Sequence, residues 1–146
     1  MKNEKLISVI VPTYNRPSLL KRTLSSIINQ SYLNIETIVV NDAGENVSDV
    51  VSSFVHPTKK FKYFENEENK GLAGTRNVAM EKATGDYFVF LDDDDILLKY
   101  ALEFRMNMLE KLNAEIVYTR ALQDIWEKAS EGYKSIHKQL YWDSPF

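Results

Sequence analysis

The sequence predicts an α/β fold in which a mostly parallel sheet carries helices on both faces. Apolar runs rich in β-branched residues recur along the chain, and segments with helical apolar spacing or polar loops separate them. This alternation is typical of parallel sheets, because two parallel strands need a crossover connection between them. The centres of the expected strands are Val9, Ile38, Tyr63, Val89 and Val117.

The bulk composition limits the class of protein. The 146 residues suffice for one domain, and the absence of cysteine excludes a disulfide framework or a thiolate metal site. A net charge of −3 gives no basic excess that would suit nucleic acid. The apolar runs are too short for a signal peptide or a transmembrane segment. We therefore expect a cytoplasmic protein, peripheral at most at the inner membrane face.

The first half of the chain is expected to supply three strands. Residues 6–11 form the first, which Pro12 ends because proline has no amide to donate to a ladder. Pro17 suits the first turn of a helix that extends to about Gln30. The elements that follow are a second strand at 35–40, a short helix at 47–55 and a third strand near a sheet edge at 61–64.

The second half continues the alternation. A polar loop over residues 65–74 precedes a helix at 75–83. The apolar run at 87–91 then suits a fourth strand that is buried on both faces. The last regular elements expected are a helix at 100–112 and a fifth strand at 116–118.

The pattern weakens past Arg120. Residues 122–128 fit a strand or a helix, and the aromatic tail beyond them has no clear period. We therefore expect one domain over residues 1–120 and a separate C-terminal segment over residues 121–146.

The most unusual stretch is residues 92–95, four aspartates directly after the fourth strand. Two carboxylates about 4 Å apart repel by roughly 1 kcal/mol in water, so hydration, a helix N-terminus or a divalent cation must offset the repulsion. Capping of the next helix explains Asp94 or Asp95 but not the whole run. Asp92 and Asp94 are spaced i, i+2 on one side of extended backbone, and Mg²⁺ or Mn²⁺ favours one or two such carboxylates with phosphate oxygens. We therefore favour a metal site at Asp92 and Asp94, with Asp95 capping the next helix and Asp93 facing water.

Two further loops carry polar side chains at the ends of strands. Thr13, Tyr14 and Asn15 follow the first strand, and Asp42 follows the second. If the strand order is 3-2-1-4, these loops and the acids line one crevice at the carboxyl edge of the sheet, where ligands bind in such folds. A nucleotide fits this crevice, with Tyr14 stacking on a base, Asp42 accepting a hydrogen bond from the base or ribose, and a metal on the diphosphate.

Other polar features carry weaker signals. Arg76 falls in the first turn of the helix expected at 75–83, where free backbone amides attract anions. A flexible loop with a solvated arginine explains the same pattern equally well. His56 and His137 have no partners at ligand spacing and are expected to be surface residues.

These motifs together resemble the nucleotide-binding half of the family 2 glycosyltransferases, which have the GT-A fold. Residues 8–16 (SVIVPTYNR) are similar to the family's opening strand and loop, and Asn69, Gly71, Arg76 and Asn77 to its glycine-containing loop and following helix. Residues 85–95 resemble the strand that leads into its D-x-D motif. The resemblance extends from Lys5 to about Thr119. Two departures are Asn41, where the family often has a second Asp, and residues 43–44 (AG), where it often has Gly-Ser.

The resemblance implies transfer of a sugar from a nucleotide diphosphate donor, with inversion and with Mn²⁺ or Mg²⁺. It implies that Pro12, Tyr14 and Asp42 contact the base and ribose, that Asp92 approaches the ribose or sugar, and that Asp94 binds the metal. Asp42 matches an aspartate that often recognises uracil, which favours a UDP-sugar. The complete set of nucleotide-binding residues expected is Pro12, Thr13, Tyr14, Asn15, Asp42, Arg76, Asp92 and Asp93.

Inversion also requires a general base that deprotonates the acceptor hydroxyl. The family's base lies in its acceptor half, and no late acid of this chain sits in a recognisable motif; these acids are Asp124, Glu127, Glu131 and Asp143. We therefore expect a truncated chain, or one shorter than a competent enzyme. Residues 121–146 would begin the acceptor region, pack on the core or pair with another subunit, and the acceptor (a glycan, a lipid-linked molecule or a protein) is left open.

Two alternative functions remain at this point. The first is a non-catalytic module of the same fold that binds a nucleotide or a partner. The second is a nucleotidyltransferase, which the glycine-free loop after the first strand disfavours.

Overall fold

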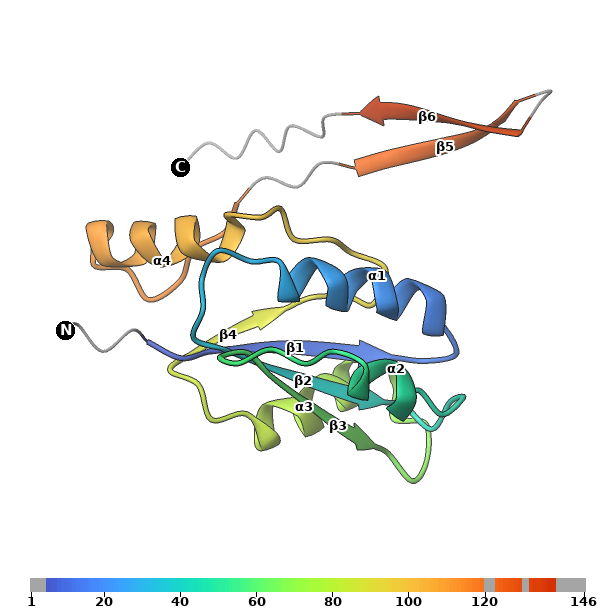
Figure 1. The fold of residues 1–146 in the computed structure, drawn as a ribbon, viewed down its shortest axis with the longest axis horizontal. Coiled ribbons are helices and arrows are strands. Elements are labelled where there is room, and N and C mark those ends of the chain that lie inside the picture. The colour runs from blue at the N-terminus through green and yellow to red at the C-terminus, as the bar shows by residue number, and fades with distance from the viewer. Residues whose placement is uncertain (1–4, 120–122, 130–131, 139–146) are drawn as a thin grey trace. The chain divides into compact units, whose positions relative to one another are not determined.

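The computed structural model describes residues 5–119, 123–129 and 132–138, and Figure 1 shows the order of their helices and strands. The chain forms two compact units, one extending to Phe104 and the other starting at Arg105. The domain boundary expected at residue 120 stays a prediction. Among the described helices, none has both the length and the apolar character needed to cross a membrane.

The first unit is built on a four-stranded parallel sheet. Its strands are β1 (Ile7–Thr13), β2 (Ile35–Asn41), β3 (Lys60–Glu65) and β4 (Tyr87–Phe90). The order is β3-β2-β1-β4 with every pairing parallel, which is the order on which the predicted crevice depended. All residues of β1 and β2 are buried, because both strands lie inside the sheet, and most of their side chains on both faces are apolar.

Helices cover both faces of this sheet. Figure 1 shows α1 (Pro17–Ile28) and α3 (Gly71–Lys82) on opposite faces, with the short α2 (Ser48–Ser52) on the chain between β2 and β3. Ile10 and Ile38 pack with Ala79 of α3 on one face. The apolar stripe of α1 is fully buried and consists of Leu20, Leu24 and Ile27. The predicted α/β fold, a parallel sheet with helices on both faces, is therefore confirmed for this unit.

At the amino-terminal edge of the sheet, a buried carboxylate links several elements. Glu36 Oε1 accepts hydrogen bonds from Ser8 Oγ at 2.6 Å and from the amide and hydroxyl of Thr84, and its Oε2 meets Lys62 Nζ at 2.7 Å. Burial alone would raise the pKa of Glu36, but these donors outweigh it and lower the pKa to about 2. Gly85 lies so close that a Cβ there would be 2.5 Å from Ser8 Oγ, so this edge has no room for a larger residue.

Two element boundaries differ from the predictions. β1 continues through Pro12 to Thr13, because β4 pairs only as far as Ile10 and the last residues of β1 form a ladder with β2 alone. A residue without an amide is tolerated where one side of the strand is unpaired. The helix expected at 75–83 already starts at Gly71, so the polar loop before it is shorter than predicted.

The prediction that the fourth strand is buried on both faces is wrong. β4 pairs with β1 and with no other strand of the described residues, which makes it an edge strand. Phe88 and Phe90 are 45% and 49% exposed. A continuous apolar run therefore did not distinguish an inner strand from an edge strand.

The second unit contains the end of α4 (Ala101–Leu112), which spans the unit boundary, and a hairpin. The prediction of a strand at 116–118 is wrong, because these residues pair with no strand of the described residues and Ile116 is 76% exposed. Three apolar residues without a neighbouring strand leave their backbone groups unpaired. The region left open at 122–128 forms β5 (Gln123–Ala129), which pairs antiparallel with β6 (Gly132–Lys138).

Candidate functional site

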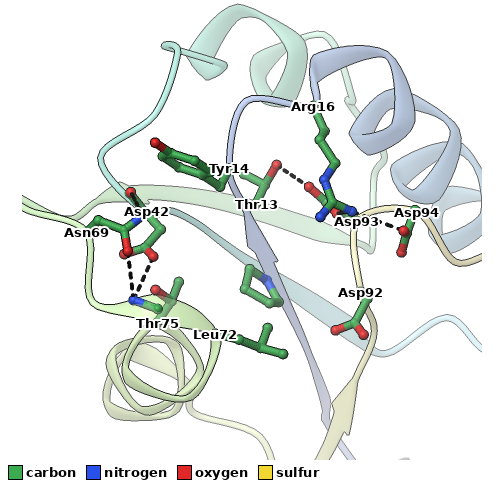
Figure 2. A pocket seen from close by; sticks show the side chains of 12 residues that line it. Thr13, Tyr14, Arg16, Asp42, Asn69, Leu72, Thr75, Asp92, Asp93 and Asp94 are labelled. Carbon is green, nitrogen blue, oxygen red and sulfur yellow. Dashed lines mark hydrogen bonds and ion pairs between the residues drawn. The ribbon is translucent and has the colours of Figure 1, made fainter.

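A pocket of about 370 Å³ lies at the carboxyl edge of the parallel sheet. The ends of β1, β2 and β4 and the start of α3 form its walls, and Figure 2 shows their side chains around one space. It is lined by Pro12, Thr13, Tyr14, Arg16, Asp42, Asn69, Gly71, Leu72, Thr75, Asp92, Asp93 and Asp94. The crevice predicted from the strand order is therefore present.

The loop after β1 presents Tyr14 to this pocket, and the residue is 48% exposed. The neighbouring Asn15 is not a lining residue: its Oδ1 accepts the amide of Glu45 at 2.7 Å. Gly44 is packed so tightly here that a Cβ would lie 2.8 Å from Asn15 Oδ1 and 3.0 Å from Tyr14 Cδ2. Asn15 thus joins the loops after β1 and β2 and holds Tyr14 in place.

Asp42 at the end of β2 is buried and ionised. Its Oδ1 accepts the amide of Lys70 at 2.7 Å and the side chain of Asn66 at 2.8 Å, while its Oδ2 accepts the amide of Gly71 at 2.9 Å. Burial acts to raise the pKa of Asp42, but these donors outweigh it and lower the pKa. The first amides of α3 are therefore satisfied by Asp42, which binds the loop before α3 to the end of β2.

Arg76 does not occupy the position predicted for it. Because α3 starts at Gly71, Arg76 lies in the second turn and does not line the pocket. Its Nη2 forms an ion pair with Oδ1 of Asp92, and its guanidinium lies 5.7 Å from the ring centre of Phe90. Arg76 thus contacts the acidic segment, on which it can orient Asp92.

The four acids fall into different environments. Asp93 is buried, because its Oδ2 accepts the hydroxyl of Thr13 at 2.7 Å and its Oδ1 lies 3.3 Å from Arg16 Nη1. The expectation that Asp93 faces water is therefore wrong. Asp92 and Asp94 are about half-exposed, with side-chain exposures of 42% and 49%.

Arginines offset the repulsion among these acids, a possibility that the sequence reasoning missed. Arg16 Nη1 lies 3.0 Å from Asp94 Oδ2, and Arg76 pairs with Asp92. Figure 2 shows Arg16 reaching from the start of α1 toward Asp93 and Asp94. The sequence did contain a clue that Arg16 lies near these acids, because Arg16 directly follows the polar loop that we expected to line the crevice.

Asp95 has no capping role. α4 begins only at Ala101, so the expectation that Asp95 caps the next helix is wrong. Its amide donates to the carbonyl of Asp92 in a turn, and its side chain is not among those that line the pocket. Partial burial, followed by the charges of Asp94 and Asp92, raises the pKa of Asp95.

The residues present fit a divalent cation that is shared with a ligand. No group of three or more metal-ligating side chains gathers anywhere in the described ranges. Asp92 and Asp94, however, are half-exposed at the pocket wall, and each arginine occupies one oxygen of its acid. Mg²⁺ and Mn²⁺ are commonly held by one or two carboxylates together with phosphate oxygens and water, which matches this donor set.

Other predicted residues lie partly outside what the structure describes. Pro12 and Thr13 line the pocket as expected. Among the late acids considered for a general base, Asp124 and Glu127 belong to β5, whereas Glu131 and Asp143 lie outside the described residues. No general base is assigned.

Comparison with known proteins gives a consistent result. The family model described as "Glycosyl transferase family 2" matches residues 8–144. The chain is 35% identical over 117 residues to UDP-Glc:alpha-D-GlcNAc-diphosphoundecaprenol beta-1,3-glucosyltransferase WfgD of Escherichia coli, a match that covers 80% of this chain and 46% of that protein.

Two solved structures are also similar. S. aureus TarS 1-349 in complex with UDP-GlcNAc superposes with a TM-score of 0.66 at 28% identity, covering 73% of this chain and 31% of that one. The mannosyltransferase PcManGT from Pyrobaculum calidifontis, in complex with GDP-Man and Mn²⁺, gives a TM-score of 0.59 at 31% identity, covering 65% and 29%. The chain thus spans less than half the length of each of these relatives.

Proposed function

The chain belongs to glycosyl transferase family 2, and from this premise we propose that it is the donor-binding part of a metal-dependent, inverting glycosyltransferase that uses a UDP-sugar. The observation that carries the proposal is the pocket at the carboxyl edge. One end of it holds the exposed Tyr14 and the ionised Asp42, and the other holds Asp92, Asp94 and Arg16 (Figure 2). These two ends match the two ends of a nucleoside diphosphate.

The base end offers stacking and hydrogen bonding. Tyr14 would stack on the base, and Asp42 would accept a hydrogen bond from a ring N–H or a ribose hydroxyl. Pro12 and Thr13 would form the wall between them. Uracil has a ring N–H that suits an ionised carboxylate, and UDP-containing TarS and the name of WfgD favour the same base. The GDP-Man complex of PcManGT shows that a similar fold also binds guanine nucleotides, so a base panel belongs in the test.

The acidic end is suited to a cation on the diphosphate. Asp94 and Asp92 would hold Mg²⁺ or Mn²⁺, Asp93 would anchor the segment through Thr13, and Arg76 would orient Asp92. When bound, such a cation would supply charge stabilisation for the departing diphosphate. Asn15 would not contact the nucleotide. It would act indirectly, because its hydrogen bond with the amide of Glu45 fixes the loops after β1 and β2.

For the acceptor, we propose a chemical class only. The name of WfgD includes a diphosphoundecaprenol acceptor, which supports a lipid-linked acceptor for this chain as well. A lipid-linked acceptor would be consistent with our further proposal that the protein acts in the cytoplasm, peripheral to the inner membrane face.

The proposal is tested by thermal unfolding with UDP, GDP, ADP and CDP, each with Mn²⁺, with Mg²⁺ and with a chelator. We expect UDP with Mn²⁺ to raise the midpoint most, because a ligand that binds only the native state stabilises it by about 2.7 kcal/mol at 100 times its Kd. Asp94→Ala should abolish the metal-dependent part of the shift.

The matched control is Asp95→Ala. It removes the same charge from the same acidic run, but Asp95 does not line the pocket, so this variant should keep the shift. Absence of a shift with every nucleotide, with or without metal, would refute the proposal. A thermal shift that is the same with and without metal, and the same in Asp94→Ala, would instead indicate a non-catalytic nucleotide-binding module.

A further inference from the structure

We propose that Arg16 couples metal binding to donor binding. Without ligand it neutralises Asp93 and Asp94, and when the donor binds its guanidinium turns to the diphosphate and leaves Asp94 to the cation. This inference rests on the proposed function of the pocket, and it assigns a role to a residue that the sequence motifs did not single out.

The position of Arg16 allows both sets of contacts. It precedes α1 directly and lines the pocket together with Asp94. Its Nη1 lies 3.0 Å from Asp94 Oδ2 and 3.3 Å from Asp93 Oδ1. Its side chain is 50% exposed, so a turn of the guanidinium meets little steric resistance. The planar guanidinium is also well suited to bind phosphate oxygens in pairs.

The two acids that Arg16 contacts are not equivalent. The Asp93 side chain is only 7% exposed, and Thr13 holds its second oxygen at 2.7 Å. The Asp94 side chain is 49% exposed, and Arg16 is its one charged partner among the described residues. Since exposed ion pairs are weak, the pair between Arg16 and Asp94 is the one that breaks most easily when the diphosphate and the cation bind.

Arg76 provides an internal contrast. It also pairs with an acid of the run, but its guanidinium rests over the ring of Phe90 and its Nε is buried. It does not line the pocket. Arg76 is therefore fixed against Asp92, whereas Arg16 faces the space that a diphosphate would occupy.

The coupling follows from the charges. A cation that arrives alone must compete with Arg16 for Asp94, and a diphosphate that arrives alone meets carboxylates. When both bind, the diphosphate gives Arg16 a new partner and the cation neutralises the acids. Each ligand thus removes the obstacle to the other, and such a coupling must be equal in both directions.

The experiment measures Mn²⁺ binding alone by electron paramagnetic resonance, and UDP binding with and without Mn²⁺ by calorimetry, for the 146-residue chain and for Arg16→Gln. We expect the variant to bind Mn²⁺ alone about two- to fivefold more tightly, the range that exposed ion pairs contribute. We expect it to bind UDP with Mn²⁺ about tenfold more weakly, because a charged hydrogen bond to phosphate is lost. The factor by which Mn²⁺ improves UDP binding should fall accordingly.

Arg22→Gln is the matched control. Arg22 is an exposed residue of α1, the helix that Arg16 precedes, and does not line this pocket, so its loss should leave all three affinities unchanged. Equal weakening of Mn²⁺ and UDP binding by Arg16→Gln, or no change in either, would overturn the coupling role while leaving the proposed function intact. Failure of the unmodified chain to bind any nucleotide diphosphate would overturn both.

Discussion

At the amino-terminal edge of the sheet, Glu36 is buried and accepts hydrogen bonds from Ser8, Lys62 and Thr84. At the carboxyl edge, Asp92 and Asp94 are half-exposed, and each meets one arginine. A carboxylate is thus buried and fully hydrogen-bonded at one edge, whereas carboxylates at the other edge are half-exposed to solvent.

The difference separates stability from binding. A buried carboxylate costs free energy unless its oxygens are hydrogen-bonded, and once they are it cannot be changed without leaving donors unpaired. Half-exposed carboxylates contribute little to stability but remain able to exchange partners. We therefore expect substitutions at the amino-terminal edge to unfold the protein, and substitutions at the carboxyl edge to impair ligand binding in a folded protein.

The largest effect is expected for Glu36→Gln. The new amide group would place its NH2 against the donors Ser8 and Thr84 or against Lys62, which leaves a buried hydrogen bond unmade. Lys62 is partly exposed and can be hydrated, so unfolding free energy should fall by about 1 to 3 kcal/mol. Urea unfolding measures this loss, and Glu68→Gln, at an exposed acid, is the control with a change within about 0.5 kcal/mol. A loss under about 1 kcal/mol would show that the network at Glu36 is not structural.

Low pH should destabilise the protein through the same amino-terminal edge of the sheet. The pKa of Glu36 is about 2 in the folded protein, against an ordinary value of 4.5. Because the folded pKa is the lower one, the stabilisation is fully present above about pH 4.5 and is lost as the pH falls toward about 2. At about 1.4 kcal/mol per pKa unit, the loss amounts to about 3 kcal/mol.

Urea unfolding at several pH values between 5 and 2.5 isolates this component, since the stability difference between the unmodified chain and Glu36→Gln should shrink as the pH falls. A difference that is constant over this range would contradict the assignment of the low pKa to Glu36.

The smallest effect on stability is expected at the opposite edge. Asp94→Asn removes an exposed ion pair with Arg16 and also relieves repulsion within the acidic run, so unfolding free energy should change by less than about 1 kcal/mol. The UDP- and Mn²⁺-dependent thermal shift should nevertheless disappear. If Asp94→Asn instead destabilised the ligand-free protein as much as Glu36→Gln does, the contrast between the two edges would fail.

Much of this architecture was predictable from the sequence because it depends on local patterns. Apolar β-branched runs located the inner strands, and Pro17 located the start of α1. The strand order 3-2-1-4 entered as a condition, under which the polar loops at the strand ends line one crevice, and the structure meets this condition. Where the structure differs, the deciding factor lay elsewhere in the chain: Asp42 satisfies the first amides of α3, which starts earlier than predicted, and the lack of a second neighbour leaves Phe88 of β4 exposed.

The sequence by itself determined the fold class, the family and the gathering of Tyr14, Asp42 and the aspartates at one sheet edge, since the carboxyl ends of parallel strands necessarily meet there. Only the tertiary structure decided how the acids differ. Residues 92–95 are four identical side chains, and their spacing in the sequence predicted the wrong environment for Asp93: it is buried against Thr13 and Arg16, whereas Asp94 is exposed. The physical reason is that charge environments depend on contacts between residues some 80 positions apart, which no local pattern records.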